Sequence, residues 1–289
     1  MTKTVSDSTR DGFGMRLAKS MKSIAKLMLS TRRARYQRVD GSRPLLIMGN
    51  GPSLAATIAA HEQLIAGGID SMAVNFAANA PEFTRLRPKY YILADPHFFA
   101  NPDDANVARL LDNIRNVDWP MTLFLPFAAR KNCPLTSSGN LTVEYYNAVG
   151  IEGFGPLERM AFDNRRGMPR PRNVLIPAIM TGIGMGYREI YITGADHTWT
   201  ATLTVDEENH VLSRQPHFYK EDEKEERRIR KEYLRYPLHS ILYSFYLAFK
   251  AYHIIEEYAR SRGVTIYNAT PGSMIDAFER KSLDSFIVH

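Results

Sequence analysis

The chain has 289 residues, enough for one large α/β domain or two small ones, and its hydrophobic content of 44% is that of a folded protein. The single cysteine, Cys133, excludes an internal disulfide framework, and no apolar run approaches the roughly 20 residues of a membrane-spanning helix. The net charge is +6, and residues 1–40 alone carry ten Lys and Arg against three Asp, so the remaining chain offers no basic patch for nucleic acid. We therefore expect a cytoplasmic protein without a signal peptide and without a nucleic-acid partner.

Residues 1–40 are predicted to form a basic, amphipathic N-terminal arm. Within it, residues 14–36 have the pattern of a helix with one apolar stripe, made of Leu17, Met21, Ile24 and Met28. Three lysines lie on the opposite face. Such a helix can lie on an anionic membrane, which would make the protein peripheral at the inner face of the membrane. It can equally pack on the domain or on another protomer, and an RNA-binding arm is a weaker alternative.

Residues 41–289 are predicted to form one Rossmann-like α/β domain, with a mostly parallel sheet and helices on both faces, because short apolar runs alternate with helix formers. Strands are predicted at residues 45–48, 71–75, 90–94, 121–125, 141–145, 189–193 and 264–267. Helices are predicted at residues 54–66, 81–86, 104–115, 174–185 and 238–259, with a short one at the C-terminus. Segments 126–140 and 147–172 are rich in Pro, Gly and Asn and are predicted to be loops.

Residues 200–236 are predicted to form a charged lid. They contain Asp206-Glu207-Glu208 and a charged run from Lys220 to Lys231, with little apolar periodicity. A charged insertion between a core strand and a core helix is typical of an active-site lid. A solvated helix with many charge pairs explains residues 220–233 as well.

The apolar run Leu45 to Met48 is followed by Gly49-Asn50-Gly51, and Pro52-Ser53 then opens a run of helix formers. A buried strand, a glycine turn and a helix N-terminus together predict an anion site, because the glycines let the backbone approach a phosphate and the first N–H groups of the helix point at it. The spacing matches neither a full dinucleotide fingerprint nor a P-loop. A tight turn without any ligand is the alternative.

Polar residues follow five of the predicted strands. In an open parallel sheet, ligands bind outside the carboxyl ends of the strands, so we expect these residues to share one cleft. They are Asn50 with Ser53, Asn75, Asp95, Asp196 with His197, and Asn268 with Thr270. Asp95 and Asp196 could hold Mg²⁺ together with substrate phosphates, or bind sugar or base hydroxyls. Residues of these types also cap turns, which is the alternative for each of them.

Two segments and one strand end carry a family resemblance. Gly-Asn-Gly-Pro-Ser-Leu at 49–54, the strand that ends in Asn75, and Gly-Tyr-Arg-Glu-Ile-Tyr-Ile-Thr-Gly-Ala-Asp at 186–196 resemble the bacterial sialyltransferases of glycosyltransferase family 42. Those enzymes share a fold-level pattern with domains resembling 6-hydroxymethylpterin diphosphokinase. The resemblance covers residues 44–275. It implies a metal-independent, inverting enzyme without a cofactor that uses a CMP-sugar donor and a glycan or glycolipid acceptor.

The resemblance also implies roles for single residues. Asn50, Gly51 and Ser53 would contact the donor phosphate and ribose, and Asn75 the nucleotide. The implied donor site is completed by Asp95, Asn173 and Asp196. The family places its general base, a histidine, at the end of the lid, which points to His239 and secondly to His217.

The chain departs from the family pattern at three positions. Asn173 stands where the family has a donor-binding Thr-Ser-Gly segment, Asp95 replaces an asparagine, and Thr198 stands where a catalytic tyrosine is expected. Lid tyrosines are the alternative contacts to the donor phosphate, namely Tyr219, Tyr233 and Tyr236.

Two further functions stay open. One is a Mg²⁺-dependent diphosphokinase-like enzyme that moves pyrophosphate from ATP to a pterin-like alcohol, with Asp95 and Asp196 holding the metal. The other is a nucleotide-binding scaffold without catalysis. The oligomeric state is also open, with a homo-oligomer among the alternatives.

Overall fold

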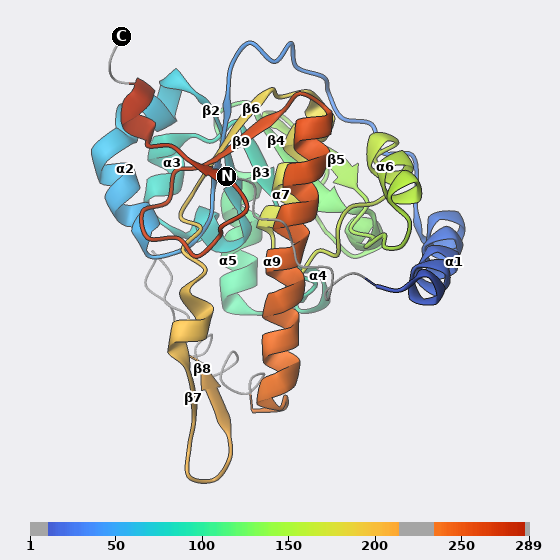
Figure 1. Ribbon diagram of the computed structural model, residues 1–289. Coiled ribbons are helices and arrows are strands. Elements are labelled where there is room, and N and C mark those ends of the chain that lie inside the picture. The colour runs from blue at the N-terminus through green and yellow to red at the C-terminus, as the bar shows by residue number, and fades with distance from the viewer. Residues whose placement is uncertain (1–10, 214–233, 287–289) are drawn as a thin grey trace.

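The computed structural model describes residues 11–213 and 234–286. Its centre is an eight-stranded sheet in the order β10-β9-β6-β1-β2-β3-β4-β5, and every neighbouring pair of strands is parallel (Figure 1). The strands are β1 (Leu45–Met48), β2 (Asp70–Val74), β3 (Tyr90–Ile92), β4 (Met121–Pro126), β5 (Leu141–Tyr146), β6 (Glu189–Thr193), β9 (Thr265–Asn268) and β10 (Glu279–Arg280). The predicted parallel α/β sheet is confirmed.

Helices α2, α3, α5, α7 and α9 match the predicted segments to within a few residues, whereas α4 and α6 are additional and α1 is shorter than expected. They are α1 (Phe13–Ser30), α2 (Ser53–Gln63), α3 (Glu82–Leu86), α4 (His97–Ala100), α5 (Ala105–Arg115), α6 (Gly155–Asp163), α7 (Leu175–Met185) and α9 (Leu238–Ser261). Asp104 caps α5, because its carboxylate accepts the N–H groups of Asn106 and Val107. Gly186 ends α7 at a φ of 104°, a left-handed backbone that favours glycine.

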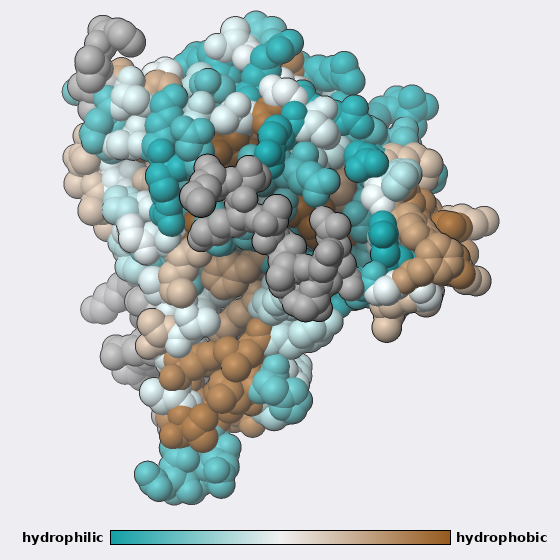
Figure 2. All heavy atoms as spheres, in the orientation of Figure 1, coloured by the Kyte–Doolittle hydropathy of each residue, from teal (hydrophilic) through white to brown (hydrophobic). Residues whose placement is uncertain are grey.

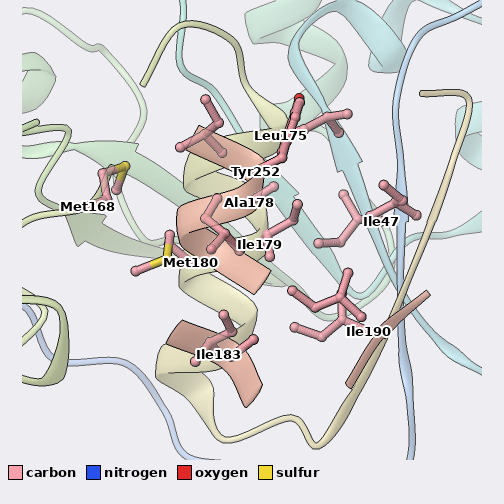
Figure 3. Close-up of a cluster of buried hydrophobic side chains, with 14 of the residues drawn as sticks. Ile47, Met168, Leu175, Ala178, Ile179, Met180, Ile183, Ile190 and Tyr252 are labelled. Carbon is pink, nitrogen blue, oxygen red and sulfur yellow. The ribbon is translucent and has the colours of Figure 1, made fainter. Parts of the chain in front are cut away.

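Helices cover both faces of the sheet, as predicted. Leu45 and Ile47 of β1 point into a core that they share with α7 and α9, whereas Leu46 and Met48 point into a second core shared with α2, α3 and α5. Figure 3 shows the first core, where α7 lies against β1 and β6. The helix approaches so closely at Gly182 that an added Cβ would lie 2.8 Å from Leu45 and 3.1 Å from Ile190.

The main differences from the expected elements lie in the second half of the chain. Helix α6 occupies part of the segment 147–172 that was expected to be a loop. Its Gly155-Pro156 pair resembles a breaker, but proline is tolerated in the first turn of a helix, where its missing N–H has no partner to lose. The expected C-terminal helix is one 3₁₀ turn, η6 (Leu283–Phe286), and the short strand β10 precedes it.

The N-terminal segment lies against the domain. Helix α1 ends at Ser30, six residues before the expected end, and residues 31–40 then run to β1. In that stretch Ala34 is buried, the Tyr36 ring packs edge-on against Phe124 at 5.7 Å, and the Val39 N–H bonds to the carbonyl of Met185 at 3.0 Å. The boundary of the predicted arm at residue 40 stays a prediction.

Only part of the predicted lid is described. Residues 198–202 form the 3₁₀ turn η5, and β7 (Leu203–Val205) and β8 (Val211–Ser213) form an antiparallel hairpin. The hairpin extends past the sheet toward the same end of the molecule as the first turns of α9 (Figure 1). Residues 214–233 lie outside the described part, so a lid that closes over a ligand stays a prediction. Among the described helices none is both long enough and apolar enough to cross a bilayer.

Candidate functional site

The sheet has a topological switch point between β1 and β6. From β1 the chain adds β2, β3, β4 and β5 on one side, and then returns to the other side of β1 to add β6, β9 and β10. In such sheets a crevice opens at the carboxyl ends of the two central strands, because their following loops turn away in opposite directions. All of the polar residues predicted to bind a donor except Asn173 follow β1, β2, β3 or β6, so they lie at this edge of the sheet.

Two glycines let the loops after β1 and β6 touch. The N–H of Gly51 donates to the carbonyl of Gly194 at 2.8 Å. A Cβ on Gly49 would lie 2.5 Å from the Gly194 oxygen, and one on Gly51 would lie 2.0 Å from a carboxylate oxygen of Asp196. No side chain fits at such distances. Gly49 and Gly51 are therefore required for the contact between the two loops, whether or not a ligand also approaches the turn.

The carboxylate of Asp196 occupies the N-terminus of α2. The Ser53 hydroxyl donates to its Oδ2 at 2.8 Å, and the Ser53 N–H donates to its Oδ1 at 3.3 Å. A negative group at this position is stabilised by the free N–H groups of the first helical turn. The anion site predicted from the glycine turn is thus filled by the protein's own carboxylate, and a donor phosphate would meet Asp196 there.

Asn50 and Asn75 connect the neighbouring strand ends. The Asn50 amide donates to the carbonyl of Val74 at the end of β2, at 3.1 Å. Asn75 has a left-handed backbone with a φ of 47°, and its side-chain oxygen accepts the N–H of Ala94, at 3.2 Å, just after β3. The carboxylate of Asp95 accepts the N–H of His97 at 2.9 Å. The structure therefore brings Asn50, Asn75 and Asp95 to one edge, while each also stabilises a turn.

Asn173 reaches the same region through a hydrogen-bonded chain. Its side-chain oxygen accepts the Leu175 N–H at the start of α7 at 3.0 Å and the Tyr252 hydroxyl of α9 at 3.0 Å. The Tyr252 oxygen lies 2.7 Å from Nε2 of His197. Because the tyrosine has one proton and donates it to Asn173, the proton between Tyr252 and His197 belongs to Nε2 of the imidazole.

His197 is buried, with 8% of its surface exposed. Its ring lies 4.0 Å from that of Trp199, and its backbone is left-handed, with a φ of 55°. Burial disfavours the charged imidazolium and lowers the pKa of His197 to about 3. His197 is therefore neutral near pH 7 and is a poor proton acceptor there. Its hydrogen bond to Tyr252 and its place directly after Asp196 indicate that it positions Tyr252 and this turn.

Of the two histidines predicted to be catalytic, only His239 lies in the described part of the protein, and it lies away from the hydrogen bonds that join Asn173, Tyr252 and His197. His239 is exposed and is the second residue of α9, thirteen residues before Tyr252. At the rise of an α-helix this places it about 20 Å along the axis from Tyr252. His217 lies outside the described residues, as do Tyr219 and Tyr233, and Tyr236 is exposed just before α9. The roles predicted for His239 and His217 stay predictions.

Three other residues singled out in the sequence have structural contacts. Asn268, the last residue of β9, and Thr270 just after the strand are both buried. The Thr270 hydroxyl accepts the Ala195 N–H at 3.1 Å and so holds the turn before Asp196. Thr198 begins the turn η5. The cluster of metal-binding side chain types found in the described part, Asp206 with Glu208 and His210, lies in the exposed hairpin turn and away from the strand ends.

Tyr252 and Trp199 are the site residues that sequence reasoning missed. Both are aromatic residues in segments where aromatics predict ordinary packing. Tyr252 lies within the long aromatic helix, and no local pattern marks which of its tyrosines faces α7. The position of His197 next to Asp196 is the signal that points to such a residue. A histidine that is buried just after a strand end needs a hydrogen-bond partner nearby, and an aromatic hydroxyl can supply it.

Comparison with known proteins yields a distant structural likeness. No protein-family model matches the sequence, and no curated protein matches it. Among solved structures, the MAf glycosyltransferase from Magnetospirillum magneticum AMB-1 is similar at a TM-score of 0.46 and 12% sequence identity. The match covers 94% of this chain and 39% of that one, so the chain spans about two fifths of the length of that protein. At this level of likeness no functional residue is transferred.

Proposed function

We propose that this chain is a glycosyltransferase that takes its sugar from a nucleotide-activated donor, specifically a CMP-sugar, and transfers it to a glycan or glycolipid acceptor. One observation supports this most. Of the two segments that carry the family resemblance, residues 49–54 directly follow β1 and residues 186–196 include β6, so both lie at the switch point. The bonds from Ser53 to Asp196 join them. A ligand bound at this crevice would meet both segments.

In this proposal the donor nucleotide lies across the ends of β1, β2 and β3. Asn50, Asn75 and Asn173 present amide groups, which bind base edges and ribose hydroxyls without requiring a fixed charge. Asp196 accepts hydroxyl protons of the donor, because a carboxylate is an acceptor for hydroxyls and repels phosphate. The phosphate then lies away from Asp196, against groups that the closing lid supplies.

The reaction is a displacement at the anomeric carbon. The acceptor hydroxyl attacks and forms the new C–O bond while the bond to the CMP oxygen breaks, and CMP leaves with the electron pair. The acceptor proton passes to a histidine, for which His239 is the first choice and His217 the second. Water is the competing acceptor, so closure over the donor limits hydrolysis. The protein supplies no metal in this scheme.

Release of CMP from a CMP-sugar in the presence of EDTA tests the proposal. We expect release by the full chain, loss of about 10²–10⁴ in rate with His239→Ala, and little change with His253→Ala, a matched histidine on the same helix. If His217→Ala loses the activity and His239→Ala keeps it, the base is His217. No release from any CMP-sugar, with the fold intact, would contradict the proposal.

A Mg²⁺-dependent diphosphokinase-like activity is the second candidate, and one observation favours it. The Asp196 carboxylate lies at the helix N-terminus where a phosphate would otherwise bind. A divalent cation between the carboxylate and an ATP phosphate would offset their repulsion. Stabilisation by ATP only when Mg²⁺ is present would support this activity over glycosyl transfer.

A further inference from the structure

The first helix of the chain is attached to the domain by its polar side. Ser20 and Ser23 are buried, together with Leu27. The Ser23 hydroxyl donates to the carbonyl of Glu152 at 2.7 Å and accepts the Glu152 N–H at 3.0 Å, and the Ser20 hydroxyl accepts the Phe154 N–H at 3.0 Å. Lys26 adds a bond to the carbonyl of Gly150 at 2.8 Å. Helix α1 is therefore held mainly by hydrogen bonds between its serine hydroxyls and the backbone of a loop, and few of its apolar side chains are buried.

The apolar side of α1 consequently faces solvent. The predicted stripe is exposed along its length, with Met21 at 65% and Met28 at 77% exposure. The exposed apolar side chains are Phe13, Met15, Leu17, Met21, Ile24, Met28 and Leu29. Figure 2 shows hydrophobic residues gathered over this end of the molecule. An amphipathic helix normally buries its apolar stripe, so this inverted attachment indicates an external partner.

The charge of α1 identifies the kind of partner. The helix contains Arg16, Lys19, Lys22 and Lys26 and no acidic residue, and the segment after it adds exposed arginines. A second copy docked through the same face would bring two such cationic helices together, which costs electrostatic energy. An anionic bilayer surface complements both features, because its acyl boundary accepts the apolar stripe and its headgroups attract the cations.

We infer that the exposed apolar face of α1 is a docking surface for anionic phospholipid membranes, with the helix lying parallel to the membrane. The two serine anchors fix the helix to the domain, so that docking holds the whole protein at the bilayer. Lys22 is exposed on the lysine face of the helix, and its long, flexible stem lets its charge reach the headgroups. This inference is independent of the proposed transferase activity.

Sedimentation of the full chain with vesicles tests the inference. We compare vesicles of phosphatidylglycerol mixed with phosphatidylcholine against vesicles of phosphatidylcholine alone. We expect binding to the anionic vesicles. Met21→Asp with Met28→Asp should weaken it about a hundredfold or more, because two apolar side chains that the membrane would bury are replaced by charges. Lys22→Gln should weaken binding roughly fivefold.

The matched control is Ala59→Asp with Ala60→Asp. These exposed alanines lie on α2, at the opposite side of the molecule from α1, and the pair makes the same change in net charge (Figure 1). Vesicle binding by this variant should be close to that of the unchanged chain, and thermal unfolding confirms that each variant is folded. Equal binding by all variants, or none by the unchanged chain, would overturn the inference. Loss of a solution dimer in the α1 variant, without vesicle binding, would assign the face to a second copy.

Discussion

The buried His197 makes the stability of the fold sensitive to mild acid. In the folded chain its pKa is lowered from 6.5 to about 3, because the ring is buried against Trp199 and Tyr252. In the unfolded chain the imidazole titrates near its ordinary value. Between these two values the unfolded state binds a proton that the folded state does not. The stabilisation is therefore complete above the unfolded pKa and is lost as the pH falls toward 3.

The size of the effect follows from the two pKa values. Lowering the pH from about 8 to about 5 protonates His197 in nearly all unfolded chains and almost no folded ones, which costs about 2 kcal/mol. For a domain of this size that corresponds to a decrease in melting temperature of about 4–8 °C from this one group. Other groups titrate over the same range, so the contribution of His197 must be isolated by difference.

The assay compares thermal unfolding of the unchanged chain and of His197→Gln at both pH values. Glutamine can still donate to the Tyr252 hydroxyl but does not titrate. We expect His197→Gln to be less stable at pH 8, owing to the lost ring contact with Trp199, and to lose about 2 kcal/mol less on acidification. An equal loss in both proteins would refute the reasoning, because it would mean that His197 takes up its proton in the folded state.

Three further results are expected. Gly51→Ala should destabilise the fold by about 1–3 kcal/mol through the clash with Asp196, whereas Gly67→Ala, where an added Cβ meets nothing within 4 Å, should have little effect on the melting temperature. Asp196→Asn should weaken CMP binding by about tenfold or more in calorimetry if the carboxylate accepts donor hydroxyls, and unchanged affinity would exclude that contact. Ser23→Ala should accelerate amide exchange in α1, because the backbone carbonyl and N–H of Glu152 both lose the Ser23 hydroxyl, and exchange as slow as in the unchanged chain would exclude the serine anchor.

Much of the fold follows from local patterns. Strands β1, β2 and β6 are short, mainly apolar runs followed by Gly or Asn, and in a parallel sheet such runs are largely buried on both faces. The start of α5 follows from Asp104, whose side chain caps the first turn, and the end of α7 follows from Gly186, whose backbone adopts the left-handed conformation. Both effects act within one helical turn and can be read from the local sequence. Helix α6 was missed because its glycine and proline, at the permitted first positions, have the composition of a loop.

The site was only partly predictable, because its decisive contacts join distant segments. The residues at strand ends were identified, since topology alone brings them to one edge. The bond between Ser53 and Asp196 joins two loops that are 143 residues apart in the sequence, so no local pattern predicts it. The orientation of α1 on the domain likewise could not be predicted from the sequence pattern. The stripe that includes Leu17 and Met21 predicts an apolar face, but it does not indicate whether the domain covers that face.

Calorimetric titration with CMP, CDP and ATP, each with and without Mg²⁺, tests the central claim most directly. The proposed glycosyltransferase should bind CMP without Mg²⁺, with an affinity that Mg²⁺ leaves unchanged and that Asn50→Ala weakens. Binding of ATP that requires Mg²⁺, with no binding of CMP, would contradict the proposal and favour pyrophosphoryl transfer. Binding of none of these nucleotides would contradict both.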